Sequence, residues 1–231
     1  MIEALQEQAI QLQKGKTALL IAPYMDKVTS IASIVERALI DYLQSEGMTV
    51  LTLEGEEAIY DNLEKILRPP LEHGYQLADL ILYVGHGLDD AWLGQQPSDR
   101  LLLTADDVGL LHDSIVVAIA CNTLKYLGNV AVTKKARAYL GFTDLVILPV
   151  TDDTMTDRNY KADFIRTLMH PVVTLVQGRT VADAVKEFAD LCYYYADLYG
   201  TKRYLLWEFH SFAMVHNANN FSYAGKPDER L

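Results

Sequence analysis

The sequence predicts an α/β fold in which a mostly parallel sheet of about six strands lies between two layers of helices. Two observations predict this fold. Apolar runs of strand length recur along the chain, at residues 18–22, 48–53, 77–84, 114–120 and 144–148. Segments with apolar residues at helical spacing separate most of them. Strands that alternate with helices form parallel sheets, because each helix returns the chain to the same end of the sheet.

Turn and cap residues set the bounds of the first elements. Strand 18–22 is stopped by Pro23, and a helix with apolar residues from 31 to 43 ends at Gly47. Strand 48–53 follows, then a helix over 58–67 that stops before two prolines. These signals predict a strand-helix-strand-helix start, leading into strand 77–84.

The second half continues the alternation. Thr104 is expected to cap a short helix that ends at Leu111, and residues 123–140 between the last two strands are expected to be mostly helical. Pro149 ends strand 144–148. Two helices are expected near 158–176 and 180–199, the second capped by Thr180, and residues 204–215 are expected to contain one more strand.

Length and composition favour one domain with a short extension. The chain has 231 residues, of which 50% are hydrophobic and 22% charged, enough to fill one globular core. Residues 1–14 read as a polar arm or helix, and residues 15–231 as a single domain. The apolar runs are shorter than the roughly 20 residues that cross a bilayer. No secretory signal is present at the start, so we expect a cytoplasmic protein without a membrane partner.

Charge and cysteine content exclude further classes. The formal net charge is −11, and no cluster of Lys and Arg indicates a nucleic-acid partner. Two cysteines, Cys121 and Cys192, are too few for a disulfide framework and fit a reducing compartment. The histidines show no regular metal-ligand spacing, so we expect neither a metal nor another cofactor.

Two of the predicted strands end in groups that can carry chemistry. Gly85-His86-Gly87 follows strand 77–84, and Cys121-Asn122 follows strand 114–120. Parallel strands place their carboxyl ends at one edge of the sheet, where ligands bind in open α/β folds. The imidazole and the thiol are therefore expected to meet there, as a cysteine–histidine dyad requires.

The chemistry of such a pair explains the neighbouring residues. An imidazole accepts the proton of a thiol that is only slightly ionised at neutral pH, and later protonates the leaving amine. A side chain at Gly87 would crowd the substrate, and the N–H groups of Gly87 and Cys121 are candidates for an oxyanion hole. Taken singly, each motif also has a structural explanation: a free cysteine is usually a small buried hydrophobe, and His-Gly is usually a turn.

The two motifs, in this order and 35 positions apart, resemble those of the caspase-like cysteine peptidases, which include caspases, gingipains, separases and CHAT-domain peptidases. Segments 92–94, 102–108 and 136–147 are similar to the CHAT and gingipain sequences around the motifs, and segment 207–212 is weakly similar to the lead-in to a last CHAT strand. The resemblance covers about residues 77–216. It implies a caspase-like α/β/α sandwich and a thiol peptidase. His86 would be the general acid/base, Cys121 the nucleophile, and Gly87 part of the oxyanion hole.

The resemblance also implies a class of substrate. In several of these families an acidic pocket selects Lys or Arg before the cleaved bond. The candidate carboxylates are Asp89 and Asp90 after the histidine motif, and Asp152, Asp153 and Asp157 after strand 144–148. Asn122 is a further substrate-binding candidate. A protein or peptide cut after a basic residue is thus one expectation, and solvated loop aspartates are the alternative reading.

The leading hypothesis is a cysteine endopeptidase that depends on a partner protein or a ligand for activation, because the sequence shows no sensor domain. One alternative is an inactive caspase-like module that binds a protein. Its motivation is the loop from Asn122 to Lys125, which lacks the glycine that caspases carry after the cysteine. The other alternative is a doubly wound protein that binds a small ligand, although Ala22-Pro23-Tyr24 replaces the glycine-rich loop of such folds.

Overall fold

A computed structural model describes residues 15–24, 26, 30–68, 78–95, 101–148 and 159–231. Their centre is a six-stranded sheet in the order β2-β1-β3-β7-β8-β9. Five strands are parallel, and β9 is antiparallel to β8. The strands are β1 (Thr17–Ala22), β2 (Thr49–Glu54), β3 (Leu80–Val84), β7 (Ile115–Ile119), β8 (Ala138–Phe142) and β9 (Phe221–Gly225).

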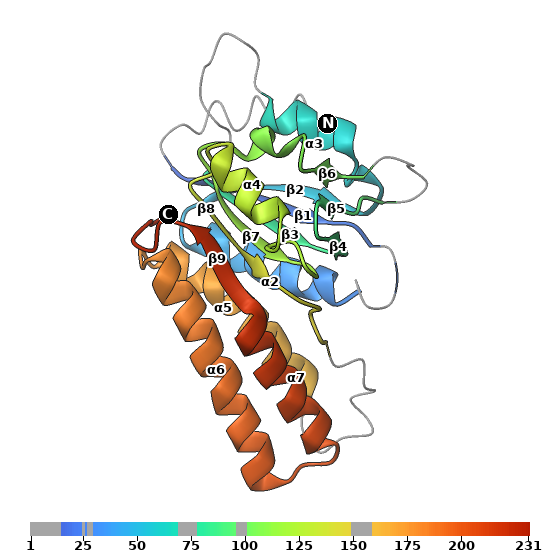
Figure 1. Ribbon diagram of the computed structural model, residues 1–231, viewed down its shortest axis with the longest axis vertical. Coiled ribbons are helices and arrows are strands. Elements are labelled where there is room, and N and C mark those ends of the chain that lie inside the picture. Colours follow the sequence, from blue (N-terminus) through green and yellow to red (C-terminus); the bar gives the residue numbers. More distant parts are fainter. Residues whose placement is uncertain (1–14, 25, 27–29, 69–77, 96–100, 149–158) are drawn as a thin grey trace.

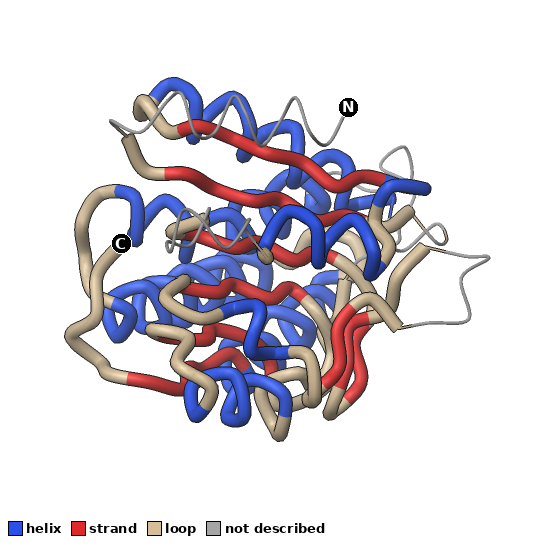
Figure 2. Tube along the Cα trace, turned by 90° about the horizontal axis from the view of Figure 1, so that it is seen from above, coloured by secondary structure: helices blue, strands red, loops and turns tan. Residues whose placement is uncertain are grey.

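Helices cover both faces of this sheet, so the fold is a three-layer α/β/α sandwich (Figures 1 and 2). One layer contains α2 (Ser30–Ser45), α5 (Tyr160–Val176), α6 (Val181–Lys202) and α7 (Trp207–Asn220). The other contains α3 (Tyr60–Leu67), α4 (Leu127–Thr133) and the 3-10 turn η2 (Val108–Leu111). Helices α6 and α7 pack together and extend well past the sheet (Figure 1).

The central strands are apolar throughout because both of their faces are buried. Along β1, Leu20 packs toward α2 and α5, whereas Leu19 and Ile21 pack toward α3. All residues of β1, β3 and β7 are buried. This explains why the sequence shows uninterrupted apolar runs at these strands instead of alternation.

A second, small sheet lies beside the carboxyl end of β3. It consists of β4 (Gly87–Leu88), β5 (Ala91–Trp92) and β6 (Leu103–Thr104), all antiparallel. Trp92 is fully buried, stacks on Tyr83 with ring centroids 4.5 Å apart, and donates its indole N–H to the Tyr139 hydroxyl at 2.9 Å. The small sheet is therefore fixed to the main one through aromatic packing.

The structure confirms the α/β class, the mostly parallel sheet, and the first elements of the chain. It also confirms the cap at Thr180, whose side chain accepts the Asp183 N–H at 3.1 Å. The expected polar segment 1–14 and the strand end expected at Pro149 lie outside the described residues. No helix in the described part of the chain has the length and apolar character needed to span a membrane.

Three expectations about the second half are wrong. The fifth strand of the sheet is 138–142, not 144–148, and only residues 127–133 of the expected helix 123–140 form α4. Residues 204–215 contain no strand; most of them belong to α7, and the last strand follows at 221–225. The short helix expected after Thr104 is a 3-10 turn, and Thr104 itself ends β6. In each case packing against neighbouring elements decides the conformation over local propensity.

Candidate functional site

The register of the sheet brings the two motifs together. Val84 of β3 is paired with Ile119 of β7 at the carboxyl ends of these adjacent parallel strands. The Gly85 N–H donates to the Ile119 carbonyl at 3.2 Å, which continues the contact past the last pair. His86 and Cys121 each lie two residues beyond that pair. They therefore follow neighbouring strands at the same edge of the sheet.

The His86 side chain contacts a carboxylate that follows a third strand at the same edge of the sheet. Its Nε2 atom lies 2.9 Å from Asp26 Oδ2. Asp26 comes from the segment after β1, which pairs with β3 on the side opposite β7. Both side chains are partly exposed, at 35% for His86 and 47% for Asp26. The sequence reasoning missed Asp26, although it is the first acidic residue after a strand that ends at the same edge.

A buried tyrosine fixes the backbone at His86. The Tyr83 hydroxyl lies 2.6 Å from the His86 carbonyl oxygen and 2.8 Å from that of Leu93, and donates to this pair of acceptors. Burial raises the pKa of Tyr83 well above its ordinary value, so the phenol stays a donor at all physiological pH values. The position of the imidazole is thus set by buried hydrogen bonds and by Asp26.

Cys121 is a free, partly exposed thiol in the turn after β7. Its Sγ atom accepts a hydrogen bond from the Val146 N–H at 3.3 Å. This contact positions the sulfur against the loop that follows β8. Within the part of the chain that the structure describes, no hydrogen bond joins Cys121 Sγ to the His86 ring.

The loop that provides this N–H is held by α7. The Asn217 side chain accepts the Ile147 N–H at 3.0 Å and donates to the Ile147 carbonyl at 2.8 Å. Asn217 is 2% exposed, so these bonds are shielded from water. His216 Nε2 donates to the Leu145 carbonyl at 2.9 Å. No sequence signal points to this contact, because the sequence predicts a strand over 144–148 and another within 204–215, and gives no sign of a helix that reaches residue 217.

Gly87 is required by the packing of the two motif segments against each other. A Cβ atom at this position would lie 2.5 Å from Thr123 Cγ2 and 2.6 Å from the Cys121 carbonyl oxygen. The sequence argument gave a different reason, the crowding of substrate. The structure shows that the neighbour to be crowded is the cysteine loop itself.

The expected substrate-binding aspartates divide into two groups. Asp89 and Asp90 are exposed in the turn between β4 and β5, and Asp89 lies 3.9 Å from the Lys125 ammonium group. Neither is a buried carboxylate of the kind that forms a closed specificity pocket. Asp152, Asp153 and Asp157 lie outside the described residues.

Asn122 has an unusual conformation beside the cysteine. Its φ angle is +62°, in the left-handed region, and its N–H donates to the Asp144 carbonyl at 3.1 Å. Its Oδ1 atom is buried and accepts no hydrogen bond from the described residues. The strained backbone is stabilised by the contact with the loop after β8.

Cys192 has the opposite character from Cys121. It is fully buried in α6, and burial raises its pKa to about 12, so it remains a protonated, unreactive thiol. Among the described residues, no group of three or more His, Cys, Asp or Glu side chains is placed to hold a metal ion.

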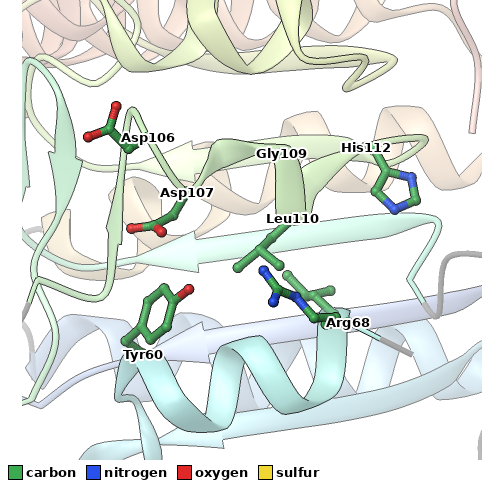
Figure 3. A pocket seen from close by; sticks show the side chains of 8 residues that line it. Tyr60, Arg68, Asp106, Asp107, Gly109, Leu110 and His112 are labelled. Carbon is green, nitrogen blue, oxygen red and sulfur yellow. The ribbon is translucent and has the colours of Figure 1, made fainter. Parts of the chain in front are cut away.

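A pocket of about 270 Å³ lies elsewhere, between α3 and η2 (Figure 3). Asp106, Asp107 and Tyr60 lie toward one end, and Arg68 and His112 toward the other. The charged groups have internal partners: Thr104 donates to Asp107 at 2.7 Å, and Arg68 lies 3.2 Å from Glu64. Neither His86 nor Cys121 lines it.

No protein-family model matches the chain, and no curated protein has significant similarity to it.

Proposed function

We propose that this protein is a caspase-like cysteine endopeptidase with Cys121 as nucleophile and His86 as general acid/base. The observation that carries the proposal is the placement of both residues two positions beyond a paired Val84 and Ile119, at the carboxyl edge of a parallel sheet. The carboxylate of Asp26 on the imidazole adds the third group that such sites use to orient the base.

The contact with Asp26 assigns different roles to the two ring nitrogens of His86. With Nε2 donating to Asp26, Nδ1 is left as the basic nitrogen. The thiol proton moves to Nδ1, the sulfur forms a bond to the substrate carbonyl carbon, and the oxygen takes the negative charge. The amine leaves with the proton from the imidazolium, and water then hydrolyses the thioester. The N–H groups of Gly87 and Cys121 are the candidates to bind the oxyanion.

The lack of a hydrogen bond between His86 and Cys121 is compatible with this scheme, because catalytic contacts in free enzymes are often long and tighten when substrate binds. It also motivates the second candidate function, an inactive module of the same fold that binds a protein. The peptidase proposal includes a regulatory partner or ligand whose binding brings His86 and Cys121 into hydrogen-bond contact.

The substrate class we propose is a protein or peptide cut after Lys or Arg. Supporting it are the net charge of −11 and the exposed carboxylates around this sheet edge: Asp26, Glu54, Asp89 and Asp90. A cytoplasmic location is proposed with it, since both cysteines are free and a reducing compartment keeps the Cys121 thiol available.

The test is cleavage of a panel of fluorogenic peptides with Arg, Lys, Asp or Leu before the reporter group. We expect the wild-type protein to prefer Arg and Lys. Cys121→Ala removes the nucleophile and abolishes cleavage, and His86→Ala lowers the rate by about 10²–10⁴-fold. Asp26→Asn is expected to give a rate between those of His86→Ala and wild type. Cys192→Ala is the matched control and retains full activity.

Activity that survives in Cys121→Ala would contradict the proposal. When the wild type cleaves no peptide, the rate of alkylation by iodoacetamide decides between the two candidates. A Cys121 thiol that reacts faster than free cysteine at neutral pH indicates a latent peptidase. A thiol that reacts no faster favours the inactive binding module.

A further inference from the structure

A tyrosine near the proposed site lies between two carboxylates. Tyr24 follows β1 and is two residues before Asp26. Its hydroxyl oxygen lies 2.6 Å from Oε2 of Glu36, in α2, and 2.9 Å from Oε2 of Glu54, at the end of β2. The three side chains thus connect the segment after β1 to a helix and to the neighbouring strand.

The two contacts need two protons. A tyrosine hydroxyl has one proton. Two neutral carbonyls can share it, as at Tyr83, but two ionised carboxylates that share one proton also repel each other at close range. With both carboxylates ionised, one of the two short contacts would set a hydroxyl lone pair against a negative oxygen. The pair of distances is satisfied when one carboxyl group is protonated: that group donates to the tyrosine oxygen, and the tyrosine donates to the other.

Burial shows which carboxyl group takes the proton. Glu36 is 3% exposed, whereas Glu54 is exposed. The second oxygen of Glu36, Oε1, is buried and has no hydrogen-bond partner among the described residues. Glu36 lines a small space between β1, β3 and α2, and the other side chains that line it are all apolar: Leu20, Ile21, Ala22, Leu39, Leu82 and Val84. An ionised carboxylate is costly in such surroundings, and a neutral acid fits them.

Among the described residues, Glu54, Tyr24 and Arg37 act on the ionisation of Glu36. Burial and the nearby charge of Glu54 raise its pKa, while the Tyr24 hydrogen bond and Arg37 on its own helix lower it, with a net value of about 7. The parts of β1 and β3 that line its surroundings supply only apolar side chains. The proton on Glu36 is therefore lost within the physiological pH range.

We propose that Glu36, Tyr24 and Glu54 form a proton-dependent anchor for the segment that carries Asp26. With the proton in place, the chain from Glu36 to Tyr24 to Glu54 is complete. When the proton leaves, Tyr24 holds only one carboxylate, and the two negative charges oppose each other across the hydroxyl group. The anchor opens as the pH rises through neutrality. For the peptidase proposed above, on which this consequence rests, Asp26 then loses its position and activity falls.

The test is hydrogen–deuterium exchange of the peptide that contains residues 22–26, corrected for the intrinsic pH dependence of exchange, between pH 5.5 and 8.5. In the wild type, exchange is expected to increase severalfold as the pH passes about 7. In Glu36→Gln it stays low and flat, because the amide carries no charge and still donates to Tyr24. Glu56→Gln changes an exposed glutamate at the same sheet edge and follows the wild type.

Two further variants keep the proposal falsifiable. Glu54→Gln removes the charge that opposes ionisation of Glu36, so the transition is expected at lower pH. The decisive variant is Tyr24→Phe, which removes both hydrogen bonds and gives high exchange at every pH. A wild-type profile in Glu36→Gln or Tyr24→Phe would overturn the anchor.

The direction in which Glu54→Gln shifts the pH of the exchange transition follows from the lost charge. Since the Glu54 charge raises the pKa of Glu36, its removal lowers the pH at which exchange increases in this variant. An unchanged transition would contradict the part that Glu54 plays in the anchor.

The exchange measurement does not depend on peptide cleavage, so the two proposals fail separately. A pH transition in exchange with no cleavage of any peptide supports the anchor and counts against the peptidase. Cleavage with the same pH profile in wild type and Glu36→Gln supports the peptidase and overturns the regulatory part of the anchor.

Discussion

At the scale of single residues, the site depends on one missing Cβ atom. The segment after β3 and the turn after β7 approach each other so closely at Gly87 that a methyl group has no space. The obstacles include the backbone oxygen of Cys121, which cannot rotate away as the end of a flexible side chain would. Close packing of this kind places the two motifs within one site.

Gly87→Ala is expected to lower the free energy of unfolding by about 1–3 kcal/mol, the usual cost of overpacking. It also separates the two motif segments and slows the reaction of Cys121 with iodoacetamide. Urea unfolding and the alkylation rate measure the two effects. Gly109→Ala is the matched control, because a Cβ there meets nothing within 4 Å, and its stability should stay within about 0.5 kcal/mol of wild type. Equal stabilities for the two variants would contradict the close approach.

At the scale of elements, the environment of the thiol is built by a helix that is distant in the sequence. Asn217 in α7 binds both polar groups of the Ile147 backbone, and the adjacent Val146 N–H donates to Cys121. In the described part of this loop, residues 143–148, the chain forms no helix or strand. Its conformation is therefore set by the helix.

Asn217→Ala leaves the Ile147 N–H and carbonyl without their buried partners, which is expected to cost about 1–3 kcal/mol of stability. The loop also loses its support, so the Val146 donor leaves the sulfur and Cys121 reacts more slowly with iodoacetamide. Asn219→Ala, on the same helix, removes only an exposed bond with Tyr193 and is the control. If both variants alkylate at the wild-type rate, α7 does not position the donor.

The elements also show what the sequence can predict. Strands β1, β3 and β7 could be predicted because both faces are buried, which leaves an uninterrupted apolar run with clear ends. The edge placement of His86 and Cys121 follows from these strands. The sequence places residues 138–140 at the end of a helix over 123–140, and only pairing with β7 makes residues 138–142 a strand. Asp26 and Asn217 act through contacts between distant segments, which no local pattern records.

At the scale of the whole molecule, a buried histidine joins the helices of one layer. The His210 ring of α7 stacks on Tyr160 of α5, with centroids 3.6 Å apart, and meets the edge of Tyr199 of α6. It is fully buried, and neither ring nitrogen has a hydrogen-bond partner among the described residues. Burial lowers its pKa to about 4, so the ring is packed as a neutral aromatic.

This histidine makes stability depend on pH. In the unfolded chain it binds a proton near its ordinary pKa of about 6.5, whereas in the folded protein it does so only near 4. The unfolded state therefore gains protons first as the pH falls, and stability decreases from about pH 6.5 to 4, by up to about 3 kcal/mol. His210→Phe keeps the stacking and removes this loss.

The measurement is the difference in unfolding free energy between wild type and His210→Phe, taken from urea titrations at pH 7 and pH 4.5. Two proteins are compared because Glu36 changes the stability with pH in the opposite direction from His210. The raised pKa of Glu36 contributes stability below about pH 4.5 that is lost as the pH rises through 7. Both proteins contain Glu36, so its contribution cancels. A difference that does not change with pH would show that His210 is not buried as a neutral ring.

The order of the elements along the chain has a consequence for biosynthesis. A ribosome delivers His86 and Cys121 well before it delivers α7 and β9, and domains begin to fold while they are being made. Until Asn217 emerges, the loop that directs an N–H at Cys121 has no support. For the proposed peptidase, the completed site therefore forms only after α7 has been synthesised and has packed against the loop at Ile147.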